Sequence, residues 1–210
     1  MKVVNLRGCH GLEAIPDLSN HNALEKLVLE RCNLLVKVPR SVGNLGKLLQ
    51  LDLRRCSSLS EFLVDVSGLK LLEKLFLSGC SDLSVLPENI GAMTSLKELL
   101  LDGTAIKNLP ESINRLQNLE ILSLRGCKIQ ELPLCIGTLK SLEKLYLDDT
   151  ALKNLPSSIG DLKNLQDLHL VRCTSLSKIP DSINELKSLK KLFINGSAVS
   201  SDTSSGVPSG

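Results

Sequence analysis

The sequence has very few aromatic residues and almost no excess of charge. It contains no tryptophan, aromatic residues make up 2% of its 210 positions, and 25 Lys and Arg against 23 Asp and Glu leave a formal net charge of +2. A core without large rings must be built from aliphatic side chains. A nearly balanced charge is atypical of a general nucleic-acid-binding domain, so we expect no nucleic-acid partner.

Long apolar runs and a leader segment are also missing. No apolar stretch approaches the roughly 20 residues that a helix needs to cross a bilayer. The first residues, Met1-Lys2-Val3-Val4-Asn5-Leu6-Arg7, lack the charged region followed by an apolar stretch that marks a signal peptide. We therefore expect no membrane partner. Charged residues make up 23% of the chain, which is typical of folded soluble domains.

Leucine fills 47 positions, and its spacing is periodic. The segment Leu24-Glu-Lys-Leu27-Val-Leu29 recurs at 48–53 and 72–77, and the pattern starts again at positions 96, 119, 142, 165 and 189. Successive starts lie 23 or 24 residues apart, and a degenerate first unit begins at Met1. This period and this pattern are those of a leucine-rich repeat.

Each unit predicts a short strand followed by a turn on the opposite side. In Leu-x-Leu the leucines face the core and the residue between them faces outward. A stretch that often begins with proline then spaces apolar residues by three, as in Ile113, Leu116 and Leu119, which favours a short 3₁₀ or α turn. We therefore predict an α/β leucine-rich-repeat solenoid (a horseshoe) with a parallel concave β-sheet and 3₁₀ or α turns on the convex side. Residues 1–199 would form eight to nine repeats, and residues 200–210 a disordered Ser/Gly-rich tail.

Six of the seven cysteines occupy one repeat position, three residues after the last strand leucine. They are Cys9, Cys32, Cys56, Cys80, Cys127 and Cys173, with Thr104, Thr150 and Ser197 in the equivalent place. We expect these small donors to point inward and to satisfy carbonyl groups of the adjacent coil. The spacing follows the repeat and contains no CxxC pair, so we expect neither disulfides nor a metal site. Cys135 lies elsewhere and is the best candidate for an exposed free thiol. Free thiols indicate a reducing compartment.

Catalytic and cofactor signatures are weak. His10, His21 and His169 lie in different units, and 43–47 lacks the spacing of a phosphate-binding loop. The acidic pair Asp148-Asp149 is more typical of a charged rim than of a hydrolase. We expect a protein that is not an enzyme and that needs no cofactor.

The outward strand positions form candidate binding columns. The central column carries Phe76, Leu100, Tyr146, His169 and Phe193, which we predict to be anchors for a protein partner; the alternative is that they pack laterally on their neighbours. The next two columns add the predicted protein-binding residues Arg31, Arg54, Arg55, Arg125, Asp148, Asp149 and Arg172. The N-terminal side of the face should be basic, although any single arginine could instead bridge to a neighbouring aspartate. A face of mixed charge suits a protein or peptide better than a polyphosphate.

Some repeats carry longer motifs in addition to the leucine spacing. Ile15-Pro16-Asp17-Leu18-Ser19, and the segment 101–110 echoed by 147–156, resemble repeats of plant intracellular nucleotide-binding leucine-rich-repeat (NLR) immune receptors of the TIR class. The resemblance implies a cytoplasmic or nuclear module that senses a pathogen effector or a guarded host protein. It also implies contacts with the receptor's own nucleotide-binding domain that contribute to autoinhibition. The alternatives are a stand-alone intracellular scaffold that bridges signalling proteins and, more weakly, an enzyme subunit whose chemistry lies in a partner.

Overall fold

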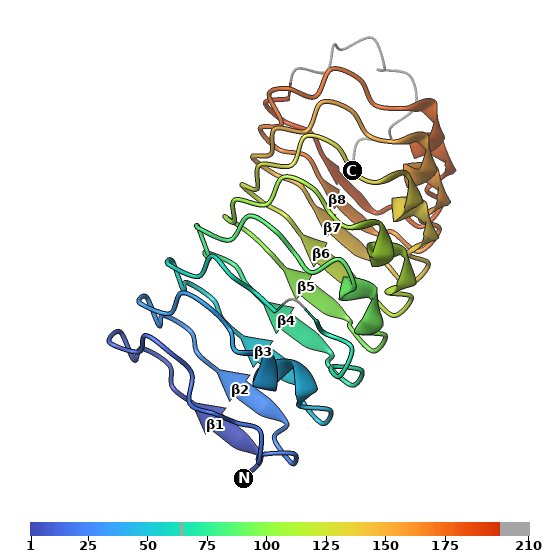
Figure 1. Ribbon diagram of the computed structural model, residues 1–210. Helices are drawn as coiled ribbons and strands as arrows, with labels where there is room; N and C mark the ends of the chain where they lie inside the picture. The colour runs from blue at the N-terminus through green and yellow to red at the C-terminus, as the bar shows by residue number, and fades with distance from the viewer. Residues whose placement is uncertain (64, 198–210) are drawn as a thin grey trace.

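The computed structural model describes residues 1–63 and 65–197, and in them the chain forms one stack of similar coils (Figure 1). Nine three-residue strands pair in parallel and in chain order to form a single sheet. They are β1 (Val3–Asn5), β2 (Lys26–Val28), β3 (Gln50–Asp52), β4 (Lys74–Phe76), β5 (Glu98–Leu100), β6 (Ile121–Ser123), β7 (Lys144–Tyr146), β8 (Asp167–His169) and β9 (Lys191–Phe193). This confirms the predicted solenoid. Residues 198–199 and the predicted tail 200–210 lie outside the described residues.

The register of the sheet follows the leucine period. Leu27 pairs with Leu51, Leu51 with Leu75, and the same alignment continues to Leu192 in β9. From β2 to β8 this central leucine is fully buried, because it points into the stack while its strand neighbours point to the opposite face. Each fully buried leucine contributes roughly 1.5–3 kcal/mol, and it does so only when the next coil covers it.

The turns on the other side of the coils are 3₁₀ helices in six units. They are η1 (Arg40–Asn44), η2 (Ile90–Ala92), η3 (Glu111–Arg115), η4 (Leu134–Thr138), η5 (Ser157–Asp161) and η6 (Asp181–Glu185). Five of them follow a proline directly, and the φ of that proline lies between −61° and −69°. Proline is pre-set for this entry angle and lacks an N–H that would otherwise be left unpaired, which explains the predicted placement.

The cysteine column is buried and hydrogen-bonded, as predicted, from the second coil onward. The thiol of Cys56 donates to the carbonyl of Leu29 at 3.1 Å, and the thiol of Cys80 donates to that of Leu53 at the same distance. Burial raises the pKa of both thiols to about 12. The hydroxyls of the column's threonines differ from the prediction: Thr104 donates to Leu101 in its own coil, at 2.8 Å.

Two predictions about cysteines are wrong. Cys9 is exposed, and its coil contains β1, which pairs only with β2 in the described sheet. Cys135, the predicted exposed thiol, is half-buried at η4, and burial raises its pKa to about 11. Cys9 is therefore the more accessible thiol of the two.

Candidate functional site

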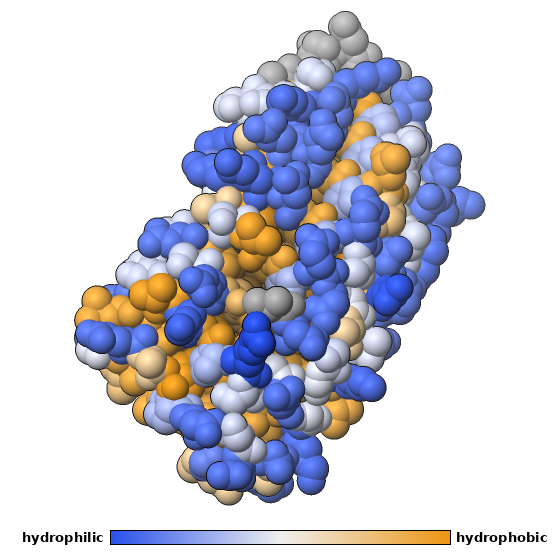
Figure 2. Space-filling view, viewed as in Figure 1, coloured by the Kyte–Doolittle hydropathy of each residue, from blue (hydrophilic) through white to orange (hydrophobic). Residues whose placement is uncertain are grey.

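The outward side of the sheet, which we call the sheet face, carries the residues that alternate with the buried leucines. Of the five predicted anchors, Phe76, Leu100, Tyr146 and His169 are half-buried, and Phe193 is 40% exposed. Other members of this column are covered: Asp52 is 2% exposed and Ser123 is 1% exposed. The sheet face is therefore an uneven surface on which the larger side chains stand out. Figure 2 shows one side of the molecule, on which apolar patches lie among polar ones.

Three rings from successive strands stack into what we call the aromatic ladder. It consists of Tyr146 in β7, His169 in β8 and Phe193 in β9. The ring centroids of Tyr146 and His169 are 4.7 Å apart at 75°, and those of His169 and Phe193 are 4.5 Å apart at 49°. The guanidinium carbon of Arg125 lies 3.9 Å from the centroid of the Tyr146 ring, within cation–π range. The ladder thus packs laterally and still offers ring surface to solvent.

Four of the predicted anchors carry rings, and three of them form the ladder. The fourth, Phe76, is separate from it. It lies in β4, and the guanidinium carbon of Arg54 is 5.3 Å from its ring centroid. The structure therefore brings together three of the predicted ring anchors and leaves Phe76 with the N-terminal arginines.

Burial lowers the pKa of His169 below its ordinary value of 6.5. Asp148 opposes this shift, since its Oδ2 lies 3.7 Å from the His169 Nδ1, while Arg125 adds to it. The net direction favours the neutral ring at neutral pH. A neutral imidazole stacks between two rings at a lower desolvation cost than a charged one.

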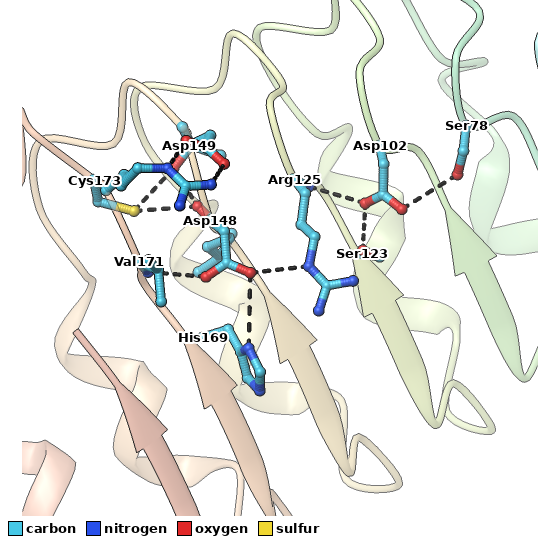
Figure 3. A network of polar contacts seen from close by, with 12 residues as sticks. Ser78, Asp102, Ser123, Arg125, Asp148, Asp149, His169, Val171 and Cys173 are labelled. Atoms are coloured by element: carbon cyan, nitrogen blue, oxygen red, sulfur yellow. Dashed lines mark hydrogen bonds and ion pairs between the residues drawn. The ribbon is translucent and has the colours of Figure 1, made fainter. Parts of the chain in front are cut away.

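Two carboxylates beside the ladder hold the backbone of the next coil (Figure 3). Asp148 accepts hydrogen bonds from the Val171 N–H at 2.8 Å and from the Arg125 Nε at 2.9 Å. Asp102 likewise accepts from the Arg125 N–H at 3.0 Å, and from the hydroxyls of Ser78 and Ser123. The carboxylate of Asp148 is thus engaged inside the protein; its role toward a partner stays a prediction. Sequence analysis missed Asp102, although it occupies the same repeat position as Asp148.

A second group of charges lies at the N-terminal end of the sheet face. We call Arg7, Arg31, Arg54 and Arg55 the arginine cluster. With Glu30 and Asp102 they line a shallow hollow of about 580 Å³, together with Ser78, Gly79 and Gly103.

Two carboxylates support this cluster from below. Glu30 lies 3.3 Å from the Arg7 Nε, 3.5 Å from Arg54 and 3.8 Å from the Arg31 Nε. Asp52 holds both the Nε and an Nη of Arg54, at 2.9 and 2.6 Å, and this hydrogen bonding raises the pKa of Arg54. The expected basic side is thus an arginine cluster interleaved with carboxylates, and the predicted site residues did not include Glu30 and Asp52, which pair with these arginines.

The outermost of the three columns is set by the backbone. All nine of its residues have positive φ, between 56° and 80°. Five are glycines, and the others are Arg31, Arg55, Asp149 and Arg172. From the sequence alone, this column is interpreted as part of a charge pattern. The structure corrects that interpretation: the left-handed conformation selects glycine, and each non-glycine residue costs roughly 1–2 kcal/mol there.

Asp149 and Arg172, from adjacent coils, form a bidentate ion pair, which offsets only part of this cost because both side chains are exposed. The Nε and an Nη of Arg172 lie 2.6 and 2.5 Å from the two carboxylate oxygens of Asp149. The hydrogen bond from Arg172 lowers the pKa of Asp149. These two predicted site residues are therefore paired with each other.

Within residues 1–63 and 65–197, no three His, Cys, Asp or Glu side chains are grouped to hold a metal ion. No helix there has the length and apolar character to cross a membrane.

The profile of a family described as a leucine-rich repeat region matches residues 75–205, more than half of the chain. This chain belongs to the leucine-rich-repeat family. Its fold resembles the leucine-rich-repeat domain of the type III effector XopL, with a TM-score of 0.79 and 30% identity over 91% of this chain and 67% of that one. It also resembles the ectodomain of the plant membrane receptor kinase GASSHO1/SCHENGEN3 from Arabidopsis thaliana. That match has a TM-score of 0.68 and 28% identity, and it covers 85% of this chain and 22% of that one.

One curated protein is similar over a short segment. Disease resistance protein RML1A from Arabidopsis thaliana is 46% identical over 48 residues, which cover 23% of this chain and 5% of that protein. The match therefore spans a small part of that relative's length.

Proposed function

We propose that this leucine-rich-repeat domain is the protein-recognition module of a plant intracellular NLR immune receptor of the TIR class. In this proposal the sheet face senses a pathogen effector or a guarded host protein. It also contributes to autoinhibition by contacting the receptor's nucleotide-binding domain, in the cytoplasm or nucleus. Support comes from the family, whose domains generally bind proteins, and from the 46% identity to part of a plant disease resistance protein. The immune-receptor-like repeats 101–110 and 147–156 add to it.

The aromatic ladder is the observation that carries the binding proposal. Its rings are ordered by one another and by Arg125 before any partner arrives, so little side-chain entropy remains to be lost on binding. Tyrosine and arginine are enriched among the residues that dominate binding energy at protein interfaces. Packing within the protein explains the stacking, but it does not explain why large rings occupy the outward column at all.

The test is a capture experiment from plant cell extract with mass-spectrometric identification. The domain is compared with the ladder variant Tyr146→Ala/Phe193→Ala and with a control, Val85→Ala/Leu134→Ala. The control removes apolar side chains of 66% and 78% exposure that lie away from the sheet face. We expect the first variant alone to lose its partner. Equal recovery by all three proteins, with unchanged thermal unfolding, would contradict a binding role for the sheet face.

The identity of the captured protein decides between the roles. A nucleotide-binding domain supports autoinhibition, and an effector or a host target protein supports sensing. The stand-alone scaffold would be favoured instead by two observations together. These are the capture of several signalling proteins and the lack of a P-loop module upstream of the repeats in the full gene product.

A further inference from the structure

The charges of the arginine cluster are arranged in two layers. The side chains of Arg7, Arg31 and Arg54 are 57%, 46% and 43% exposed. The carboxylate-bearing side chains beneath them are covered: Glu30 is 10% exposed and Asp52 is 3% exposed. An approaching partner therefore meets guanidinium groups, although carboxylates lie below.

The cluster also contains more cations than its own carboxylates can pair. Three arginines share Glu30, and Asp52 is directed at Arg54 alone. Within the described part of the chain, Arg55 forms no ion pair, and the nearest approach of Arg31 to a carboxylate is 3.8 Å. Guanidinium donors thus remain available for an acidic ligand.

The backbone gives a second, independent argument. Arg31 and Arg55 have φ values of 65° and 60°, where five of the nine coils use glycine. Arg172 has the same conformation, but its side chain is held by Asp149. Within the described residues, neither Arg31 nor Arg55 has a bidentate pair like that of Arg172. Internal pairing therefore does not account for their long side chains at this strained position. A residue kept in a costly conformation is grounds for a functional hypothesis.

The hollow beside these arginines has room for a ligand. Gly79 in the next coil lies against Arg55, and a Cβ there would come within 3.2 Å of the Arg55 Cγ. Gly79 and Gly103 leave the surface open next to the guanidinium groups, in the hollow of about 580 Å³.

We propose that the arginine cluster binds an acidic segment of a protein partner, with Arg31 and Arg55 as its main contacts. This rests on the proposed role of the sheet face in protein binding and adds the chemistry of the partner. A polypeptide with a few carboxylates fits better than a nucleic acid, because Glu30 and Asp102 line the same hollow and would repel a continuous phosphate backbone.

The test uses fluorescence anisotropy with a fluorescein-labelled peptide of alternating glutamate and serine. A peptide with glutamine in place of glutamate is the control ligand. Arg31→Gly/Arg55→Gly removes both side chains while giving the backbone the residue it favours. Arg172→Gly is the matched control protein, because it makes the same change at the same backbone conformation where the charge is already paired.

We expect the glutamate peptide to bind the unmodified domain more tightly than the glutamine peptide, and its affinity to fall as salt is added. The double variant should bind roughly tenfold more weakly, and Arg172→Gly should stay within about twofold. If the double glycine variant fails to fold, Arg31→Gln/Arg55→Gln removes the charges and leaves the backbone as it is.

Three results would overturn the inference. The first is that the double variant and the unmodified domain bind the glutamate peptide with equal affinity. The second is that Arg172→Gly loses as much affinity for this peptide as the double variant does. The third is that an oligothymidylate of the same charge binds more tightly than the peptide, and that its binding also depends on Arg31 and Arg55. If the unmodified domain does not bind the glutamate peptide, while partner capture still depends on the ladder, this inference alone is refuted. The reverse result, acidic-peptide binding with no ladder-dependent capture, would refute the proposed function of the ladder and leave the arginine site standing.

Discussion

The two ends of the sheet face use the same repeat positions to different effect. At the C-terminal end, Asp148 bonds to a backbone N–H of the next coil, and Asp149 is paired with Arg172. At the N-terminal end, the carboxylate of Glu30 is shared by the side chains of three arginines. The repeat therefore fixes the conformation of each position, while the adjacent coil determines whether a charge there is engaged internally or remains for a partner.

The largest expected contrast is between removing the two buried carboxylates. The side chains of Asp148 and Glu30 are similarly covered, at 11% and 10% exposure. Asp148→Ala leaves the Val171 N–H and the Arg125 guanidinium without their acceptor, so we expect a loss of about 3 kcal/mol in the free energy of unfolding. Glu30→Ala frees arginines that are exposed enough to be hydrated, so we expect about 1 kcal/mol or less. Urea unfolding of the two variants measures the difference.

Site-resolved thiol labelling shows where the loss occurs. Cys173 lies beneath the Asp148 region and its thiol donates to the Leu147 carbonyl at 3.1 Å, whereas Cys56 lies beneath the arginine cluster. Asp148→Ala should speed the labelling of Cys173 more than that of Cys56, because solenoid coils open locally. Equal stabilities for Asp148→Ala and Glu30→Ala, or uniform labelling, would remove the distinction between the two ends.

The left-handed column offers a smaller effect that isolates the backbone. Gly103 has a φ of 67°, and a Cβ added there would meet no atom within 4 Å, so Gly103→Ala tests conformation without steric conflict. We expect a loss of about 1 kcal/mol in the free energy of unfolding, as for other non-glycine residues in this region. Urea unfolding measures it, and an unchanged midpoint would mean that the left-handed conformation costs this chain nothing.

The reverse change at the two ends sharpens the comparison. Arg55→Gly should leave stability equal or raise it by up to about 1 kcal/mol, since relief of strain outweighs the greater freedom of glycine in the unfolded chain. Arg172→Gly should gain less, because it also breaks the pair with Asp149. Thermal unfolding of the two variants checks this, and a clear loss of stability in Arg55→Gly would mean that Arg55 serves packing.

The sequence predicts the scaffold more fully than the site, for a physical reason. Buried leucines and the cysteine column repeat at a fixed period, so their burial follows from the pattern. The left-handed column also had a visible signal, glycine in five of nine units, but its arginines made it look like a charge pattern. The contacts of Asp102 and Asp148 with the next coil depend on the offset between coils, which the period alone does not specify. The stacking of His169 between two rings likewise depends on how three strands are placed relative to one another.

The smallest expected effect is a pH dependence confined to the ladder. Because the folded-state pKa of His169 lies below 6.5, the unfolded chain binds more protons between that pKa and 6.5. The contribution of His169 to stability therefore rises with pH across this window, is complete above it, and is lost on acidification. The charged groups that face the His169 ring shift its pKa in both directions. Asp148 and Asp167 raise this pKa, and Arg125 and Lys191 lower it.

An NMR titration of the His169 ring tests this assignment directly. Its midpoint should lie below 6.5, and Arg125→Gln should raise it by removing a cation that lowers the pKa. Arg31→Gly/Arg55→Gly should leave the midpoint unchanged, because the arginine cluster lies in other coils and arginine stays charged throughout this range. A midpoint at or above 6.5 would mean that Asp148 balances or outweighs burial, and a midpoint above 7 would mean that the ladder holds an imidazolium at neutral pH. Acidic groups on a partner, rather than apolar ones, would then be the better match for that end of the sheet face.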